Sequence, residues 1–393
     1  MQELGDIIIR IFRIARRECG IMRRNAIYFF CMVFFPIFVI FFFTTFLQEG
    51  QPSDMPVGIV DNDQTTTTRA LIRKLDAFQA SHVTAYYPNV NEARKAIQEN
   101  KIYAFLYFPK GTTEELLASR QPKISFYYSN TSLTAGAQLM KELKTISSLG
   151  SAAVGQATLR AKGATDKQIQ AFLQPIVIDL HAITNPYTNY NYYLSTFLIP
   201  GILMLFIFLI SAYSLGTELK FKGSEELMKL ADNNIYVALI GKYLLQHIIF
   251  LVIMLGYCWY LFGCLHFPHE GSLWMLILLA VLTVLVGQAF GIFIFGLMPS
   301  LRMSMSICSL WAMLGFTACG ATFPITAMDS PIVALANLFP LRHYYMIYQL
   351  CVFNGYPFTT AWFHFMAMGI FLCLPFFIIK NIRRALLEFQ YIP

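Results

Sequence analysis

Long uncharged stretches recur along the chain, separated by short polar segments. The first covers residues 26–47, and five more follow at 192–217, 243–268, 271–301, 303–328 and 343–379. A helix needs about 20 mainly apolar residues to cross a bilayer. The first five stretches each have room for one such helix, and the last holds a shorter segment followed by a sixth. One stretch could be a buried helix of a soluble protein, but six predict a polytopic α-helical membrane protein.

The polar segments complete the predicted organisation. We expect a cytoplasmic interfacial helix at 1–25, transmembrane helices at 26–47 and 191–217, and an extracytoplasmic domain at 48–190 between them. A cytoplasmic coupling segment at 218–234 leads to four more transmembrane helices within 235–380. A short extracytoplasmic segment is expected around 326–357, and a cytoplasmic tail at 381–393. Charged residues make up only 13% of the chain, against about 25% in soluble domains.

Lysine and arginine predict the orientation, because they are enriched in cytoplasmic loops. They precede the first span, follow the second, separate the fourth and fifth, and follow the sixth, whereas the short loops on the opposite side offer only Arg342. Both termini are therefore expected in the cytoplasm. The net charge of +7 reflects this bias and does not indicate nucleic-acid binding.

The segment 48–190 has the alternating pattern of an α/β domain. Strands are expected at 56–61, 83–87, 103–108 and 124–128, and helices at 68–80, 91–100 and 113–118. From 132 to 172 the pattern is mainly helical, with a break near Gly163. Asp61 and Asp63 follow the first strand, where stabilisation of a turn is favoured over a cation site.

The first 20 residues predict an amphipathic helix. At about 100° per residue, Leu4, Ile8 and Phe12 share an apolar face with their neighbours. Arg10, Arg13, Arg16 and Arg17 lie opposite and are expected to face lipid headgroups.

Residues with obvious chemistry are scarce. No glycine begins a phosphate-binding GxxxxGK[ST] loop, and no nucleophile elbow or His-Glu-x-x-His helix occurs. The span centres carry few ionisable groups, which disfavours a secondary transporter. His247 is expected to bond to a neighbouring helix, and Gly287 and Gly291 to allow close helix packing within the chain. No metal-ligand spacing is present among the eight cysteines.

The order of several short motifs resembles the permease family of type-2 ABC exporters, in the branch with a large domain between spans one and two. The motifs are Arg16-Arg17-Glu18, MPVGIVDND at 55–63, IYAFLYFPKG at 102–111, Asn185-Pro186 with FLIPG at 197–201, Ile240-Gly241-Lys242, and NLFP at 337–340 before Tyr344-Tyr345. The resemblance covers nearly the whole chain.

The resemblance implies a mechanism. Two permease subunits pair, as a homodimer or with a paralogue, and a separate ABC ATPase subunit docks on the loop after span two. ATP and Mg²⁺ are used by that subunit, and this chain binds no cofactor. The implied ATPase-coupling residues are Glu218, Lys220, Lys222, Glu225, Glu226 and Leu227, and those of the interfacial helix are Arg10, Arg13, Arg16, Arg17 and Glu18. Phe221 to Ser224 depart from the pattern of relatives, in which a second acid and Gly-Thr are commoner.

The sequence therefore predicts the permease subunit of an exporter in a bacterial inner membrane. The expected substrate is lipophilic or drug-like, and lipids and polysaccharide precursors stay open. A periplasmic adaptor and an outer-membrane channel are further partners that the resemblance allows. The alternative is a membrane-anchored sensor or assembly protein that acts through the domain at 48–190.

Overall fold

The computed structural model describes residues 2–118, 120–174, 181, 185 and 188–388. The chain divides into two compact units. The membrane unit combines Met1–Gln48 with Asn189–Pro393, and the inserted unit is Glu49–Thr188. Each unit has its own hydrophobic core.

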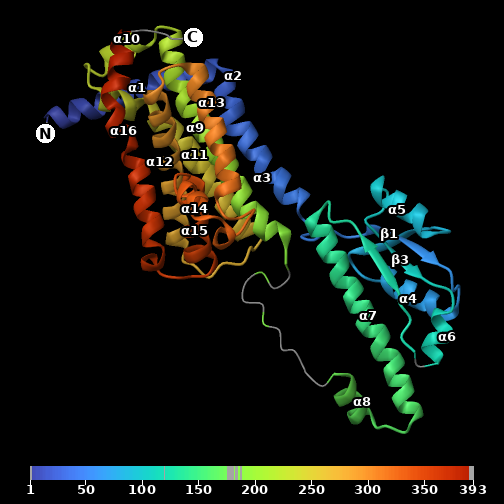
Figure 1. Ribbon diagram of the computed structural model, residues 1–393. Helices are drawn as coiled ribbons and strands as arrows, with labels where there is room; N and C mark the ends of the chain where they lie inside the picture. Colours follow the sequence, from blue (N-terminus) through green and yellow to red (C-terminus); the bar gives the residue numbers. More distant parts are fainter. Residues whose placement is uncertain (1, 119, 175–180, 182–184, 186–187, 389–393) are drawn as a thin grey trace. The chain divides into compact units, whose positions relative to one another are not determined.

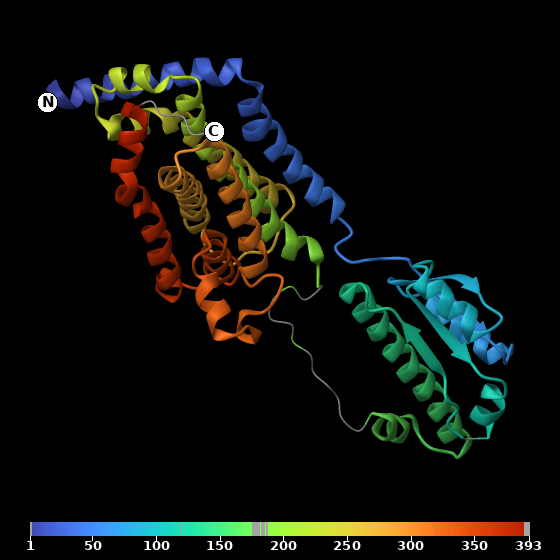
Figure 2. The ribbon, with the colours of Figure 1, turned by 45° about the horizontal axis from the view of Figure 1, so that its top comes forward.

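The described part of the membrane unit consists of helices joined by loops, without strands (Figures 1 and 2). Its elements are α1 (Gln2–Arg24), α2 (Ala26–Phe29), η1 (Phe30–Phe34), α3 (Phe35–Phe46), α9 (Tyr190–Lys220), α10 (Ser224–Leu230), α11 (Ile235–Cys258), η2 (Trp259–Cys264), α12 (Leu273–Leu297), α13 (Leu301–Ala318), η3 (Ile325–Ala327), α14 (Ser330–Ala336), α15 (Pro340–Ile347), η4 (Tyr348–Phe353), η5 (Phe358–Ala361) and α16 (Trp362–Glu388).

Six candidate spans are present among the described residues, at Ala26–Phe46, Tyr190–Lys220, Ile235–Cys264, Leu273–Leu297, Leu301–Ala318 and Phe358–Glu388. The prediction of six membrane-spanning helices is therefore confirmed. The sixth continues to Glu388, beyond the expected end at residue 380, and the last residues of the predicted tail, 389–393, lie outside the described part.

α12 contacts α9, α11 and α16, and α9 also contacts α3 and α13. An added Cβ atom at Gly287 would lie 2.8 Å from Ile207 of α9, and one at Gly291 would lie 2.7 Å from the carbonyl oxygen of Phe208. The absence of side chains at these two positions therefore brings α12 and α9 together, which confirms the expected packing within the chain. His247 contacts Gln288 of α12 with 3.0 Å between Nδ1 and Oε1, as predicted.

The inserted unit is built on a four-stranded sheet with the order β2-β1-β3-β4. Its strands are β1 (Met55–Asp61), β2 (Ser81–Tyr86), β3 (Ala104–Phe108) and β4 (Ser125–Tyr128), and its helices are α4 (Thr66–Asp76), α5 (Val90–Gln98), α6 (Thr112–Leu117), α7 (Leu133–Ala161) and α8 (Asp166–Leu173). β1 is parallel to β2 and β3, and β4 is antiparallel to β3.

Both faces of β1 are covered, as its nearly continuous apolar sequence indicates. Val57 and Ile59 pack in the core that includes α4 and α7, and Val60 packs in a second core with α5. The predicted strands agree with the structure to within two residues. The predicted first helix is too long, because Asp76 accepts the amide of Val83 and Ser81 bonds to the carbonyl of Leu75, which turns the chain into β2.

Candidate functional site

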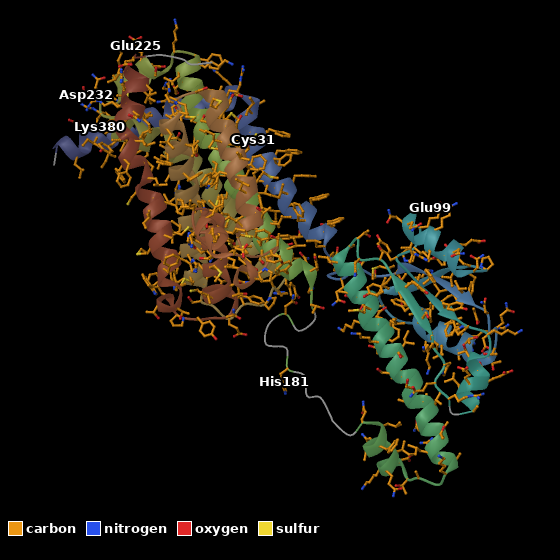
Figure 3. All side chains as sticks on the ribbon, in the orientation of Figure 1. Cys31, Glu99, His181, Glu225, Asp232 and Lys380 are labelled. Carbon is orange, nitrogen blue, oxygen red and sulfur yellow. The ribbon has the colours of Figure 1, made fainter. Side chains whose placement is uncertain are left out.

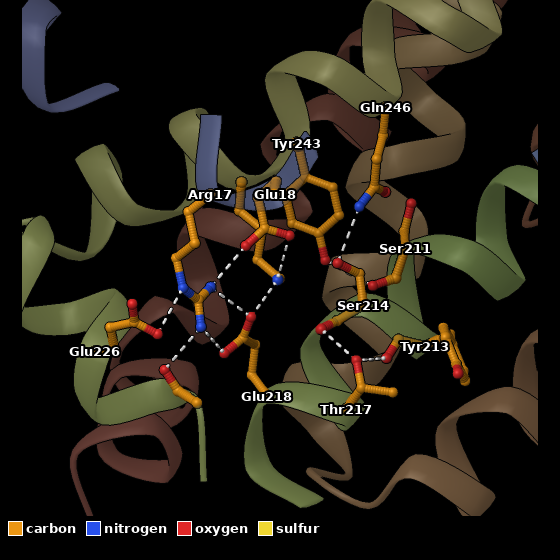
Figure 4. Close-up of polar contacts among 12 residues, drawn as sticks. Arg17, Glu18, Ser211, Tyr213, Ser214, Thr217, Glu218, Glu226, Tyr243 and Gln246 are labelled. Atoms are coloured by element: carbon orange, nitrogen blue, oxygen red, sulfur yellow. Dashed lines mark hydrogen bonds and ion pairs between the residues drawn. The ribbon is translucent and has the colours of Figure 1, made fainter. Parts of the chain in front are cut away.

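Five charged side chains from four helices meet at one end of the membrane unit (Figure 4). They are Arg17 and Glu18 of α1, Glu218 of the last turn of α9, Glu226 of α10 and Lys242 of α11. We call this group the charge cluster. Two of its members that bond to each other, Glu18 and Lys242, are 224 residues apart in the sequence.

Arg17 is the centre of the charge cluster. Its guanidinium binds Glu218 through two bonds, Nη1 to Oε1 at 2.8 Å and Nη2 to Oε2 at 3.0 Å. Nε donates to Glu226 Oε2 at 3.0 Å, and Nη1 also donates to Glu18 Oε1 at 2.8 Å. Burial by itself lowers the pKa of Arg17, but the bonds and charges of Glu218, Glu226 and Glu18 outweigh it and raise the pKa above its ordinary value. Arg17 is therefore a permanent cation that joins three helices.

Lys242 completes the buried part of the charge cluster. Its Nζ lies 2.9 Å from Glu18 Oε2 and 2.8 Å from Glu218 Oε1. Lys242 and Glu18 are 1% and 0% exposed. Two cations and two carboxylates therefore neutralise one another away from solvent, and removal of any one leaves an uncompensated buried charge.

Two glycines make room for this arrangement. An added Cβ atom at Gly223 would overlap the carboxylate of Glu218 and lie 3.0 Å from Nη2 of Arg17. The carbonyl of Gly223 also accepts a bond from Arg17 at 3.2 Å. An added Cβ atom at Gly241 would lie 2.8 Å from Ile14 of α1. The Gly241-Lys242 pair thus supplies both a close approach for α1 and a charge for its Glu18.

A row of polar contacts continues from the charge cluster between α9 and α11 (Figure 4). The hydroxyl of Tyr243 donates to the carbonyl of Ser211 at 2.6 Å. Gln246 donates to the hydroxyl of Ser214 at 2.9 Å. These contacts tie the two helices together over more than a turn beyond Lys242, so a force on the charge cluster acts on both.

The predicted coupling residues divide into exposed and buried ones. Lys220, Lys222, Glu225 and Glu226 are exposed. Glu218 is 5% exposed and Leu227 is fully buried, so neither is available to a docking protein in this conformation. α9 also continues to Lys220, which places Glu218 in a helix rather than in the loop. The coupling role of these residues stays a prediction.

The predicted interfacial arginines also divide. The expectation that all four face lipid headgroups is wrong for Arg17, which is turned into the charge cluster, and for Arg10, which bonds to Asp232 at 2.8 Å. The helical pattern could not reveal this, because the carboxylates that attract them come from distant segments. Arg13 and Arg16 are exposed.

The carboxylates of the inserted unit stabilise turns, as predicted. Asp61 accepts the amides of Asp63 and Gln64. Asp63 accepts from the hydroxyl of Thr113 at 2.6 Å, and also from the amides of Thr113 and Gly111. The Thr113 hydroxyl is the first cause of the lowered pKa of Asp63. No group of His, Cys, Asp and Glu suited to a metal ion occurs among the described residues.

Sequence reasoning missed two sets of contacts. Lys242 is predicted only as a cytoplasmic-side charge and as part of the Ile240-Gly241-Lys242 motif, with no pairing to Glu18, although a lysine two turns inside an apolar helix needs a buried partner. Arg342 is predicted only as a loop residue. Arg342 instead lies buried in α15 and donates to Asn337 at 2.9 Å. The adjacent His343 contacts His364 of α16, with 2.9 Å between the two Nδ1 atoms.

The comparisons with known proteins agree with this architecture. The model of the family described as "ABC-2 family transporter protein" matches residues 26–379, which include all but the end of the last span. No curated protein sequence matches the chain. Pro186, part of one of the short motifs, lies outside the described residues. The family model covers nearly the whole chain, and the protein belongs to the ABC-2 transporter family, whose members are membrane permeases of ABC transporters.

Proposed function

We propose that this chain is the membrane-spanning subunit of an ATP-driven exporter. It moves a lipophilic or drug-like substrate from the cytoplasm or the inner leaflet outward. The family implies a separate ATPase subunit as partner. In the proposal that subunit binds ATP and Mg²⁺ and docks on the exposed side of α10, and a second permease subunit completes the transport path.

The observation that carries the proposal is the link between α10 and the spans. Glu225, Glu226 and Lys229 of α10 are exposed, whereas Leu227 and Met228 anchor it in the core. Glu226 and the carbonyl of Gly223 both bond to Arg17, which in turn bonds to α9. A movement of α10 would therefore pull on α1, α9 and, through the shared carboxylates, on α11.

The proposed orientation places this end of the membrane unit in the cytoplasm. Glu225, Asp232 and Lys380 lie together at this end (Figure 3). The arginines of α1 and the lysines at 220, 222 and 229 also belong to it. With this orientation, the membrane unit would lie in a bacterial inner membrane and the inserted unit outside the cytoplasm. A periplasmic adaptor and an outer-membrane channel would be further partners there.

The test is purification of the tagged chain from native membranes with a photo-crosslinking residue in place of Glu225. We expect covalent capture of an ABC ATPase, with ATP turnover in the purified complex. The matched control carries the same residue at Glu99, an exposed position of the inserted unit, and should not capture the ATPase (Figure 3). Recovery of the chain without a nucleotide-binding partner would contradict the proposal.

A second test addresses coupling. Reversal of charge at Glu225 and Glu226 should uncouple ATP hydrolysis from transport while the protein still inserts, because both side chains are exposed. Glu218 is left intact, since its reversal would disrupt the buried charges. Normal transport by the double variant would argue against docking on α10.

The second candidate function is a sensor or assembly protein that acts through the inserted unit. A groove of about 770 Å³ favours it, lined by α4, α7 and α8 and including Phe78, Leu149 and Gln156. Deletion of residues 55–180 separates the two functions. A sensor would lose its recognition surface, whereas an exporter would keep its ATPase partner.

A further inference from the structure

Helix α1 presents three different sides along its length. Ile14, Glu18 and Met22 are buried against the membrane unit. Leu4, Ile8 and Phe12, spaced four residues apart, form an exposed apolar stripe, with Leu4 and Phe12 each 64% exposed. Four arginines complete the helix surface without an ion pair among the described residues: Arg13, Arg16, Arg23 and Arg24.

The membrane unit fixes the rotation of α1. Ile14 packs on Gly241, Arg10 binds Asp232, and Arg17 and Glu18 enter the charge cluster. The side chain of Asn25, directly after α1, donates to the hydroxyl of Tyr213 at 2.9 Å. The apolar stripe therefore cannot turn inward to find protein contacts.

The position of α1 places the stripe at the membrane boundary. α1 ends at Arg24, and the first span begins at Ala26 (Figure 2). A helix with large apolar side chains on one side and arginines beside them is suited to lie in the headgroup region. The stripe would meet acyl chains, and arginines at its edge would reach the phosphates.

The four unpaired arginines are not equivalent. At about 100° per residue, Arg23 and Arg16 lie about 20° and 40° from Phe12, at the edge of the stripe. The expectation that Arg16 lies opposite the apolar face is therefore wrong. Arg13 and Arg24 lie about 100° or more from Phe12, away from it. Arg16 and Arg23 are about 10 Å apart along the axis, at 1.5 Å per residue.

We propose that α1 carries a binding site for anionic phospholipid, in which Phe12 and Ile8 contact the acyl chains and Arg16 and Arg23 bind headgroup phosphates. Arg16 is adjacent to Arg17, so the lipid site directly borders the charge cluster. Bound lipid holds the helix that contributes Arg17 and Glu18. The inference goes beyond the proposed export function and does not depend on the identity of the ATPase or the substrate.

The test measures phosphatidylglycerol binding to the full chain in mild detergent by native mass spectrometry, with phosphatidylcholine as the neutral reference. The wild type should prefer phosphatidylglycerol. If each arginine strengthens binding about fivefold, the R16Q/R23Q variant should bind phosphatidylglycerol roughly 25-fold more weakly. R13Q/R24Q removes the same charge from the side away from the stripe and should change binding less than about threefold.

Two further arms keep the result interpretable. Glycerol phosphate, which has a phosphate but no acyl chains, should not compete, and equal competition would overturn the lipid assignment in favour of free phosphate. R16K/R23K should retain most binding. All variants should unfold at the wild-type midpoint in phosphatidylcholine alone, since the substituted side chains are exposed.

Equal losses of phosphatidylglycerol binding in R16Q/R23Q and R13Q/R24Q would show general charge attraction only, and would refute the site. Absence of any preference for phosphatidylglycerol would also refute it.

Discussion

The charge cluster of the membrane unit and the Asp61–Asp63 turn of the inserted unit both surround carboxylates with donors, but by different means. Asp63 bonds mainly to backbone amides and hydroxyls of turns at the ends of β1 and β3. Glu18 and Glu218 bond to the same two cations, Arg17 of α1 and Lys242 of α11. The turn is partly exposed and can be hydrated if it loses a bond, whereas Glu18, Glu218 and Lys242 of the charge cluster have little access to water. Charge balance is therefore a condition of folding in the charge cluster and a local adjustment in the turn.

The largest expected effect follows from removing the buried ammonium. Lys242→Met leaves Glu18 and Glu218 with one cation between them, and breaking a buried pair in this way costs about 3–5 kcal/mol. We expect a corresponding fall in the free energy of unfolding, measured by denaturant titration in mixed micelles with tryptophan fluorescence. All four tryptophans lie in the membrane unit, so the signal reports on it alone.

The matched control is Lys380→Met, at an exposed lysine of α16. It should unfold within about 0.5 kcal/mol of the wild type. Equal midpoints for the two variants would show that the buried charges do not depend on one another.

Arg17→Lys keeps the positive charge but loses the planar guanidinium group with its several N–H donors. A lysine cannot reproduce the paired bonds to Glu218 together with the bond to Glu226. Loss of hydrogen bonds between charged groups predicts a decrease of about 1.5–3 kcal/mol in the same titration. Arg16→Lys, one residue away on the exposed side, should leave the unfolding free energy unchanged. A comparable loss in Arg16→Lys would mean that the paired guanidinium bonds of Arg17 are not the cause of the decrease.

Gly241→Ala tests the approach of α1 rather than the charges themselves. The new methyl group would press on Ile14 and would lie 3.1 Å from the carbonyl oxygen of Ile11. Overpacking of this kind costs about 1–3 kcal/mol, and we expect the lower part of that range because α1 can shift outward. Gly256→Ala, in the same helix with no neighbour within 4 Å, should cause no loss. Equal tolerance of both substitutions would contradict a close α1–α11 contact.

The two regions also differ in what the sequence could predict. The turn role of Asp61 and Asp63 was predictable, because Asp61 bonds to amides two and three residues ahead. The spans and strands were predictable because apolar runs and their lengths can be read within each segment of the chain. The ends of α4 and α9 were not. Ser81 and Asp76 stop the first, and Glu218 in the last turn of the second bonds to Arg17 and Lys242, which come from other helices.

The pairing of Glu18 with Lys242 could not be read from a single sequence for the same reason. It depends on α1 folding back onto α11, and nothing local to either residue specifies that contact. The sequence does indicate that Lys242 needs a charged or polar partner, because a lysine inside an apolar helix is seldom unpaired. The small residue beside it, Gly241, was a second signal that another helix approaches at that point.

Asp63→Asn should give the smallest and most local effect. At neutral pH the amides of Gly111 and Thr113 should exchange with deuterium several times faster than in the wild type, because a neutral amide is a weaker acceptor than a carboxylate. Asp54→Asn, in the same unit, is the control and should not change exchange at these amides. The lowered pKa of Asp63 means that its stabilisation is complete above the ordinary value of 3.8 and is lost as the pH falls through the lowered one. After correction for the intrinsic exchange rate, wild type and variant should therefore converge in acid, while exchange in the charge cluster stays slow in both. A difference that persists in acid would show that the Asp63 carboxylate does not act through its charge, and the contrast between the two regions would no longer hold.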